Sequence, residues 1–358
     1  MNAASISYVP RSRHVFLLAT TVILHFCVAG IWIQGEYQIQ QQWTTTNRPS
    51  NNSEVSKERL NDVLPTTSHK FIYPKEPDTV LSGSENDACI ARQDVLWKMA
   101  IFIKSSAKNF KRREFLRRSW ASYRFVQDGM IQTIFVVGNA TDPTTDQLLN
   151  DEFMRYKDIL QYSGPDDYRN ISLKTLAGMQ WCSQNYKDVD FYTSGDDDFL
   201  IDLVAMRNTL VEFRETTIKN RWPEYPIICM YEKRQNTRPH RHKDKWHVPI
   251  EEYKWPMWPD FCLGGFYTMS VNVTIQLWDL AQVQKPVRMD DVWITGILRQ
   301  QFGLPNVMLV VPGKKRTVAK HTVGFKNDKS KNLSGVVQKD WEKLKQNLQK
   351  ITTCTVPQ

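Results

Sequence analysis

From about residue 90 onward, the chain alternates short apolar runs with segments of mixed polarity. The apolar runs are typical of buried strands and lie at residues 95–103, 131–137 and 189–193. Between them, apolar side chains recur at helical spacing, which predicts helices over residues 109–123, 144–156 and 170–186. Strands that alternate with helices predict an α/β body, residues 91–358, built on a parallel, Rossmann-like sheet.

The N-terminal region carries a different pattern. Residues 15–33 form an apolar run of 19 residues without Asp, Glu, Lys or Arg, long enough to span a bilayer as one helix. Arg11 and Arg13 precede this run, so the positive-inside rule places residues 1–14 in the cytoplasm and everything after the run on the far side. The alternative is a signal peptide that is cleaved near Ala29. We favour an uncleaved signal-anchor, because the apolar run continues through Ile33.

Residues 34–90 are rich in Gln, Thr, Asn, Ser and Pro and show no sustained period, so we expect an extended lumenal stem. Five Asn-x-Ser/Thr sequences follow the anchor, which agrees with a lumenal or extracellular location. In that oxidising location the cysteines beyond the anchor can form two disulfides, whose pairing the sequence leaves open. The candidate glycosylation sites are Asn51, Asn139, Asn170, Asn272 and Asn332.

The net charge of the chain indicates which kinds of binding partner it favours. The 358 residues include 47 Lys and Arg against 38 Asp and Glu, a net charge of +9. This excess suits nucleic acid, a membrane face or a phosphate-bearing small molecule. We exclude nucleic acid, because the body lies beyond a membrane and carries no nucleic-acid-binding motif. The sequence contains neither a P-loop nor a GxGxxG motif, so phosphate recognition has to come from other residues.

An acidic cluster follows the third strand candidate. Asp196, Asp197 and Asp198 are consecutive, and open α/β sheets bind ligands at the carboxyl ends of their strands. Adjacent carboxylates repel each other, and a bound cation relieves that repulsion. Carboxylate oxygens suit Mg²⁺ or Mn²⁺, which commonly bridge to substrate phosphates. The alternatives are a solvated acidic turn and calcium binding without catalysis.

A basic segment follows the first strand candidate and contains Arg112, Arg113 and Arg117. The planar guanidinium matches phosphate oxygens, so these arginines are candidates for binding a diphosphate. The alternative is a solvated helix face.

Taken together, these residues resemble the β1,3-galactosyltransferase family, which includes β1,3-N-acetylglucosaminyltransferases. The similar motifs appear in family order and cover about residues 95–305. They comprise Asn109 to Trp120 around the arginines, Phe135-Val136-Val137-Gly138, Asp166-x-Tyr168-x-Asn170-Ile171-Ser172-Leu173-Lys174-Thr175, the aspartate triplet, Lys245-Trp246, Trp258-Pro259-x-Phe261-Cys262-x-Gly264-Gly265-x-Tyr267, and Asp290-Asp291-Val292.

The chain also departs from the family pattern. The family's Asp-Phe pair within the middle motif is replaced by Ser163-Gly164, and the Glu of its Glu-Asp-Val motif by Asp290. An insert at residues 232–244, with His240 and His242, has no counterpart. These departures affect the expected donor and acceptor specificity more than the reaction class.

The resemblance implies a type II Golgi membrane protein with a GT-A fold: a Rossmann-like mixed sheet flanked by helices, on a single transmembrane helix. It further implies an inverting hexosyltransferase that takes galactose from UDP-galactose and uses Mn²⁺, with Mg²⁺ as the alternative. The acceptor is a glycan on lipid or protein. UDP-GlcNAc or UDP-GalNAc as donor is the sister hypothesis, and a membrane-anchored carbohydrate-binding module or a purely structural membrane protein would be a different class. The oligomeric state stays open.

The resemblance also assigns roles to residues. Asp198 is expected to be the main metal ligand, with Asp196 and Asp197 directed toward the metal or the nucleotide. Asp291 is the candidate general base, although a carboxylate at the start of a helix is the structural alternative. His321 is a candidate third metal ligand, with an ordinary surface histidine as the alternative. Expected acceptor-binding residues are Trp258, Gly264, Gly265 and Tyr267, of which the aromatic ones also suit a core.

Overall fold

The computed structural model describes residues 70–79, 95–220, 227–232, 237–303, 309–310, 319–321, 335–351 and 353–355, all of them within one compact unit, Leu64–Gln358. No helix in these ranges has the length and apolar character needed to cross a membrane. The predicted cytoplasmic tail and the membrane anchor at residues 15–33 lie outside the described residues, as do Asn51 and Asn332.

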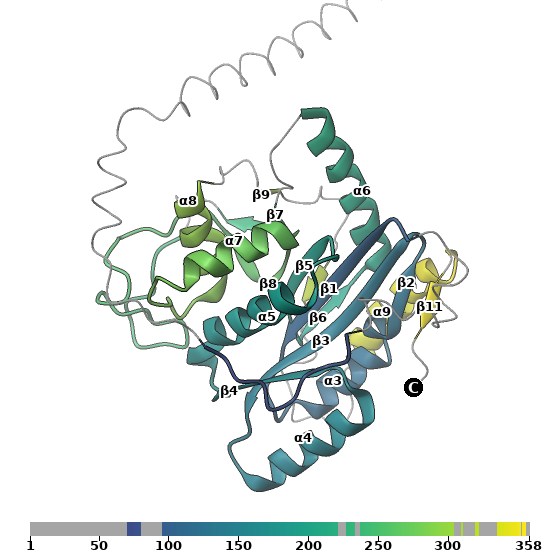
Figure 1. Ribbon diagram of the computed structural model, residues 1–358, viewed down its shortest axis with the longest axis horizontal. Helices are drawn as coiled ribbons and strands as arrows, with labels where there is room; N and C mark the ends of the chain where they lie inside the picture. Colours follow the sequence, from purple (N-terminus) through teal and green to yellow (C-terminus); the bar gives the residue numbers. More distant parts are fainter. Residues whose placement is uncertain are drawn as a thin grey trace, which may run out of the picture. The chain divides into compact units, whose positions relative to one another are not determined.

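The described part of the chain is an α/β fold around one large mixed sheet (Figure 1). Four parallel strands form its centre, in the order β4-β3-β1-β5. Strand β8 runs antiparallel to β5, and β7 and β9 continue the sheet beyond it. On the other side, β2 and β11 add an antiparallel edge. The bounds are β1 Trp97–Lys104, β2 Tyr123–Val126, β3 Gly129–Asn139, β4 Ile159–Pro165, β5 Phe191–Asp196, β7 Ile227–Glu232, β8 Phe261–Ser270, β9 Leu309–Val310 and β11 Thr353–Thr355.

The central strands are buried on both faces, which explains why their sequences are apolar throughout rather than alternating. In β1, Met99, Ile101 and Ile103 belong to one hydrophobic core, whereas Ala100 and Phe102 belong to the other. Helices α5 and α7 contribute to the second of these cores, and α3, α4, α6 and α9 to the first. The bounds are α3 Phe110–Arg117, α4 Pro143–Tyr156, α5 Ile171–Asn185, α6 Leu203–Asn220, α7 Val271–Ala281, α8 Arg299–Phe302 and α9 Gly335–Leu348.

The predicted strands and helices of the first half of the body are confirmed, with one correction. The helix predicted over residues 109–123 ends at Arg117, and Tyr123–Val126 pair with β3 as a strand. A tight connection through Gln127, at φ 58°, allows this hairpin. The sheet is mixed rather than purely parallel, which fits a GT-A arrangement.

The predicted stem boundary at residue 90 does not hold for residues 70–79. This segment runs along β4, where the Gln161 N–H donates to the Lys75 carbonyl at 2.9 Å and the Ser163 N–H to the Ile72 carbonyl at 2.8 Å. Phe71 and Tyr73 pack against the core of the α5 side. Residues 70–79 therefore belong to the folded body.

Candidate active site

The site forms where β1 and β5 end beside β8. Lys104, the last residue of β1, is in register with Asp196, the last residue of β5. Gly195 is in register with Phe266 of β8, which brings Gly264 and Gly265 to the same edge. Asp290 and Asp291 approach this edge from the start of the π-helix η5, Val292–Leu298. Ligands of open α/β sheets bind at this edge.

Lys104 joins these elements. Its side chain is 4% exposed, and its ammonium group lies 2.8 Å from Asp290 Oδ2 and 3.2 Å from Asp196 Oδ1. It also donates a hydrogen bond to the Gly264 carbonyl at 3.1 Å. Burial alone would lower the pKa of Lys104, but the charges of Asp196 and Asp290 raise it well above its ordinary value. The sequence analysis missed Lys104, although a lysine that directly ends an apolar strand was a visible signal.

The two adjacent aspartates have different environments. Asp290 is held by Lys104 and by the hydroxyl of Thr175, which donates to Oδ2 at 2.6 Å. Asp291 is 8% exposed, and its Oδ1 accepts a hydrogen bond from the Val292 N–H at 2.8 Å. Burial, followed by the charge of Asp290, raises the pKa of Asp291 to about 7. A carboxylate with a pKa in this range suits a general base that works near neutral pH.

Gly264 leaves room for the Asp291 carboxylate. A Cβ at this position would lie 3.0 Å from Asp291 Oδ2, so any side chain there would crowd the candidate base. A Cβ at Gly265 would overlap the ring of Phe199. Both glycines thus lie at the candidate site, Gly264 against Asp291 and Gly265 against Phe199, and at either position a larger residue would clash with its neighbour.

The three consecutive aspartates lie at the end of β5 and in the turn to β6, Phe199–Ile201. Asp197 is buried and accepts hydrogen bonds from Ser105, Asn109 and Arg112, at 2.7, 2.8 and 2.9 Å. Its carboxylate therefore fixes the loop before α3, and the predicted contact with the nucleotide does not fit this geometry. Asp196 and Asp198 are only partly buried.

Asp196 and Asp198 are the two aspartates of the triplet that remain candidates to hold a divalent cation. Asp196 Oδ1 is buried and accepts no hydrogen bond from the described residues, although Lys104 lies within ion-pair distance. Burial raises the pKa of Asp196 to about 6, and the charges of Asp290 and Asp198 add to the rise. Within the described ranges, no three His, Cys, Asp or Glu side chains are arranged to hold a metal. Mn²⁺ and Mg²⁺ are commonly bound through one or two carboxylates together with substrate phosphates, which agrees with this set.

The predicted third ligand, His321, lies on β10, Ala319–His321, whose antiparallel pairing places His321 opposite Phe199. Its backbone is therefore next to the residue that follows Asp198. Its role as a ligand stays a prediction.

Two of the three predicted diphosphate-binding arginines have structural roles. Arg113 is fully buried and uses all five N–H donors, three of them on Ser105, Ser106 and Ala107. The other two bind Glu152, at 2.9 and 2.6 Å. In this arrangement Arg113 has no donor left for a phosphate.

Arg117 is engaged in the same way. It pairs with Asp158 at 2.7 Å and with Glu152 at 2.6 Å, and its guanidinium stacks on the ring of Tyr156. A direct contact of Arg117 with the donor does not fit this packing. Arg112 differs, because its side chain is partly exposed and pairs with Asp197 at the site.

The predicted acceptor-binding aromatics are core residues. Trp258 and Tyr267 are both buried, and Trp258 packs on Tyr253 with ring centroids 4.4 Å apart. Exposed aromatics lie elsewhere: Tyr168 is 40% and Trp246 45% exposed. The ammonium group of Lys245 lies 4.0 Å from the Tyr168 ring centroid and 5.7 Å from that of Trp246. Both residues belonged to the family-like motifs, but the sequence could not show which aromatic side chains are exposed.

Asp166 was given no role from the sequence, although it lies in one of the family-like motifs. Asp166 accepts hydrogen bonds from the backbone N–H groups of Ala107 and Gly138, and it pairs with Lys174 at 2.6 Å. It thereby holds the loop after β1 against the end of β3. Among the candidate glycosylation sites, Asn139 and Asn272 are exposed and Asn170 is half-buried.

Comparison with known proteins identifies the family. Residues 111–310 match the galactosyltransferase family profile. The chain therefore belongs to the galactosyltransferase family, which confirms the resemblance seen in the sequence.

The relatives carry two kinds of name. The chain is similar to the Drosophila melanogaster protein named beta-1,3-galactosyltransferase brn, at 32% identity over 209 residues, which cover 58% of this chain and 61% of the relative. It is similar to the Danio rerio lactosylceramide 1,3-N-acetyl-beta-D-glucosaminyltransferase A, at 27% identity over 58% of this chain and 55% of the relative. It is also similar to human beta-1,3-galactosyltransferase 5, at 26% identity over 55% of this chain and 61% of the relative. The chain thus spans about three fifths of the length of the curated relatives it matches.

Proposed function

We propose that this protein transfers galactose from UDP-galactose, in β1,3 linkage and with inversion, to a glycan acceptor on a glycolipid or glycoprotein. The observation that carries the proposal is the position of Asp291. It is buried, its pKa is raised to about 7, and it lies beside the sheet edge where Asp196 and Asp198 are candidates to hold a cation. Family membership and the names of the relatives support the reaction class.

In this mechanism Asp291 takes the proton of the acceptor hydroxyl as that oxygen attacks the anomeric carbon. General base catalysis by a positioned carboxylate contributes about 10²–10⁴-fold. Lys104 and Thr175 both bind Oδ2 of Asp290 and hold that carboxylate in place. In Asp291, Oδ1 accepts the Val292 N–H, and Oδ2 accepts no hydrogen bond from the described residues, so we propose Oδ2 as the atom that takes the proton. The low exposure of Asp291 keeps bulk water away from the base.

On the donor side, we propose Asp198 and Asp196 as the residues that hold a divalent cation, Mn²⁺ or Mg²⁺. A cation held there would supply positive charge to stabilise the negative charge that UDP acquires as it leaves. We propose that Arg112 contacts the nucleotide, a role supported by its partial exposure and by its pairing with Asp197.

On the acceptor side, we propose that Tyr168 and Trp246 contact the sugar. Partial burial of the phenol raises the pKa of Tyr168 to about 12, and the charges of Asp290, Asp196 and Asp291 add to the rise. Exposed aromatic faces suit the apolar face of a pyranose.

The second candidate function keeps the chemistry and changes the donor to UDP-N-acetylglucosamine. The observation that favours it is the similarity, at 27% identity, to the Danio rerio and human lactosylceramide N-acetylglucosaminyltransferases. We further propose a Golgi lumenal location on a signal-anchor, on the basis of the apolar run at residues 15–33 and the sequons beyond it.

The test is UDP release by the full chain, purified in detergent, with a panel of UDP-sugars and β-galactoside, N-acetylglucosaminide and lactosylceramide acceptors. We expect acceptor-dependent release with UDP-galactose and Mn²⁺. We expect no release with chelator, and none from Asp198→Ala or Asp291→Ala. Release only with UDP-N-acetylglucosamine would select the second candidate. Acceptor-dependent release that persists in Asp291→Ala would refute Asp291 as the base.

A further inference from the structure

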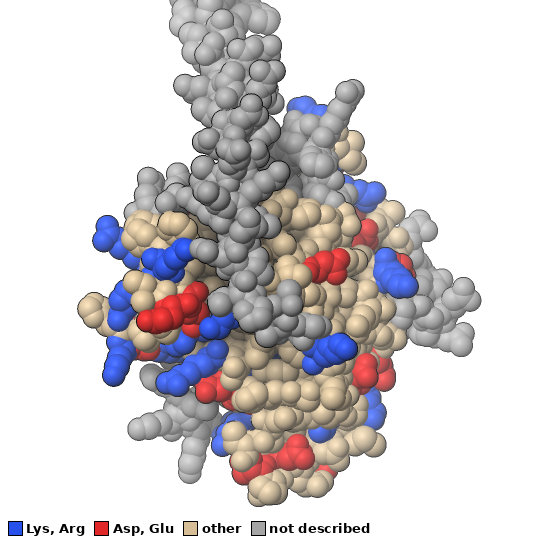
Figure 2. Space-filling view, turned by 60° about the vertical axis from the view of Figure 1, so that its left-hand side comes forward, with Lys and Arg blue, Asp and Glu red and all other residues tan. Residues whose placement is uncertain are grey.

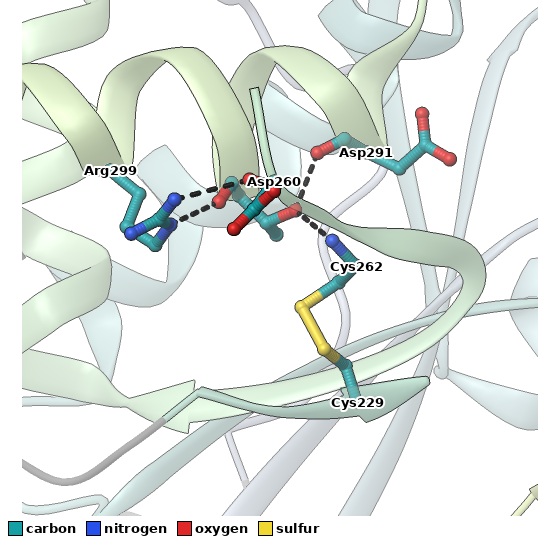
Figure 3. The surroundings of a disulfide bond; sticks show 6 residues. Cys229, Asp260, Cys262, Asp291 and Arg299 are labelled. Atoms are coloured by element: carbon teal, nitrogen blue, oxygen red, sulfur yellow. Dashed lines mark hydrogen bonds between the residues drawn. A yellow bond between two sulfur atoms is a disulfide. The ribbon is translucent and has the colours of Figure 1, made fainter. Parts of the chain in front are cut away.

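A buried threonine connects the strand that carries a disulfide to the helix that begins at the candidate base (Figure 3). Cys229 of β7 and Cys262 of β8 form the disulfide. The hydroxyl of Thr295 accepts a hydrogen bond from the Cys262 N–H at 2.8 Å. The same hydroxyl donates to the Asp291 carbonyl at 2.6 Å, so one side chain joins both backbones.

The connection has a second point of attachment one turn further along. Arg299 is fully buried, and its Nε donates to the Thr295 carbonyl at 2.7 Å. Its Nη2 donates to the Asp260 carbonyl at 3.1 Å, just before β8 begins (Figure 3). The start of β8 is thus hydrogen-bonded to successive turns of the helix that follows Asp291.

What this connection fixes is the distance between Asp291 and Gly264. Gly264 lies two residues after Cys262, and its Cα faces the Asp291 carboxylate closely enough that a Cβ would be 3.0 Å from Oδ2. Its carbonyl also accepts the hydrogen bond from Lys104. A shift of β8 against the helix would therefore move the base relative to Lys104 and to the acceptor. A misplacement of about 1 Å in an active site can cost on the order of 100-fold in rate.

We infer that Thr295 is a positioning residue for Asp291, and that the Cys229–Cys262 disulfide anchors the strand end of the same connection. The inference rests on the proposed function, in which Asp291 is the base. The Asp291 carboxylate points away from the hydrogen bonds of Thr295, which contact only backbone groups of Asp291 and Cys262 (Figure 3). Thr295 accordingly sets the place of the base without taking part in proton transfer.

The donor side offers a contrast. Asp196 and Asp198 lie on β5 and the turn after it, and neither Thr295 nor the disulfide contacts them in the hydrogen bonds described. Loss of the connection is therefore expected to lower kcat by roughly ten- to a hundredfold while KM for the UDP-sugar stays within about twofold. A general loosening of the fold would not separate these constants in this way.

The test compares three variants of the full chain. Thr295→Val keeps the shape and removes both hydrogen bonds, whereas Thr295→Ser keeps the hydroxyl. Thr268→Val is the matched control, because Thr268 is also buried on β8 and, among the described residues, its hydroxyl bonds that of Thr193 alone, at 2.8 Å. We expect kcat to fall in Thr295→Val alone, with wild-type-like kcat in Thr295→Ser and in Thr268→Val despite a similar loss of melting temperature.

A second measurement does not depend on any variant folding. Reduction of the wild-type disulfide with dithiothreitol should lower kcat with little change in KM for the donor, while tryptophan fluorescence shows a folded protein. Equal kcat in Thr295→Val and Thr268→Val, or unchanged kcat in the folded reduced enzyme, would overturn the inference. Absence of transfer by wild type with every UDP-sugar would instead overturn the proposed function.

Discussion

Replacement of Lys104 by Met tests how far the carboxylate cluster depends on one buried cation. Met has a similar length and no charge, so the change preserves most packing and leaves Asp196 and Asp290 without their shared partner. Removing one partner of a buried ion pair costs about 3–5 kcal/mol. Asp290 is buried, but the Asp196 side chain is 34% exposed and can regain some hydration. We therefore expect a loss of about 3 kcal/mol in the free energy of unfolding.

The pH dependence follows from the direction of the pKa shift. The carboxylates raise the pKa of Lys104 above its value in the unfolded chain, 10.5. A raised lysine pKa means that the stabilisation is fully present below the unfolded pKa and is lost only as the pH rises through the higher folded value. Titration of Lys104 itself should consequently not change the difference between wild type and Lys104→Met between about pH 7 and 9. Burial raises the pKa of Asp196 and of Asp291, and the charge of Lys104 opposes that rise. In the variant these carboxylates therefore take up protons at higher pH, and the difference should shrink as the pH falls toward 7.

The assay is urea unfolding followed by tryptophan fluorescence, for Lys104→Met, Asp290→Asn and the double variant. The double variant should be more stable than the sum of the two single losses predicts, by about 1–3 kcal/mol, because it leaves no charge of that pair unpaired. A loss below about 1 kcal/mol in Lys104→Met, or additive losses, would refute the role of Lys104 as the shared cation.

Four further predictions follow from the site. Wild-type kcat/KM should rise with pH through about 7, because Asp291 must lose its proton to act as a base, and this limb should be absent from the residual activity of Asp291→Asn. The same variant should be more stable than wild type at pH 8, by about 1–3 kcal/mol in thermal unfolding, since a raised carboxylate pKa lowers stability as the pH rises from about 4 to 7. Arg113→Lys should destabilise the fold by about 2–4 kcal/mol, because lysine cannot replace both hydrogen bonds to Glu152. Calorimetry on the folded fraction should find unchanged affinity for UDP and Mn²⁺, and weakened binding would indicate that Arg113 contacts the donor after all. Trp246→Ala should raise KM for the acceptor about tenfold and leave KM for the donor unchanged, whereas equal effects on both would refute an acceptor contact.

Much of the fold could be predicted from the sequence, because β1, β3 and β5 are buried on both faces and their sequences are therefore mostly apolar rather than alternating. The helix over α3 was predicted six residues too long, since Tyr123–Val126 form a strand through pairing with β3 that no local pattern shows. Residues 70–79 were assigned to the stem for the same reason: their packing on β4 depends on contacts with residues far along the chain.

The site was predictable in part. Asp196, Asp291, Gly264 and Gly265 lie at the same edge of the sheet, and Asp198 follows in the turn after β5, while their roles stay predictions. Charge and residue type could not show that Arg113, Arg117 and Asp197 are bound by other protein side chains. Arg113 binds Glu152, Arg117 binds Asp158 and Asp197 binds Asn109, and these contacts depend on how the loops pack. Burial likewise decides that Trp258 and Tyr267 are core residues whereas Tyr168 and Trp246 are exposed.

The most direct test of the central claim is the stereochemistry of the product together with its dependence on Asp291. The full chain would be incubated with UDP-galactose, whose galactose is α-linked, Mn²⁺ and a soluble glycan acceptor, and the product analysed by proton NMR. An inverting transfer with Asp291 as base predicts a β1,3-linked product from wild type and at least a 100-fold slower reaction in Asp291→Asn. An α-linked product, or a β-linked product formed at an undiminished rate by Asp291→Asn, would contradict it.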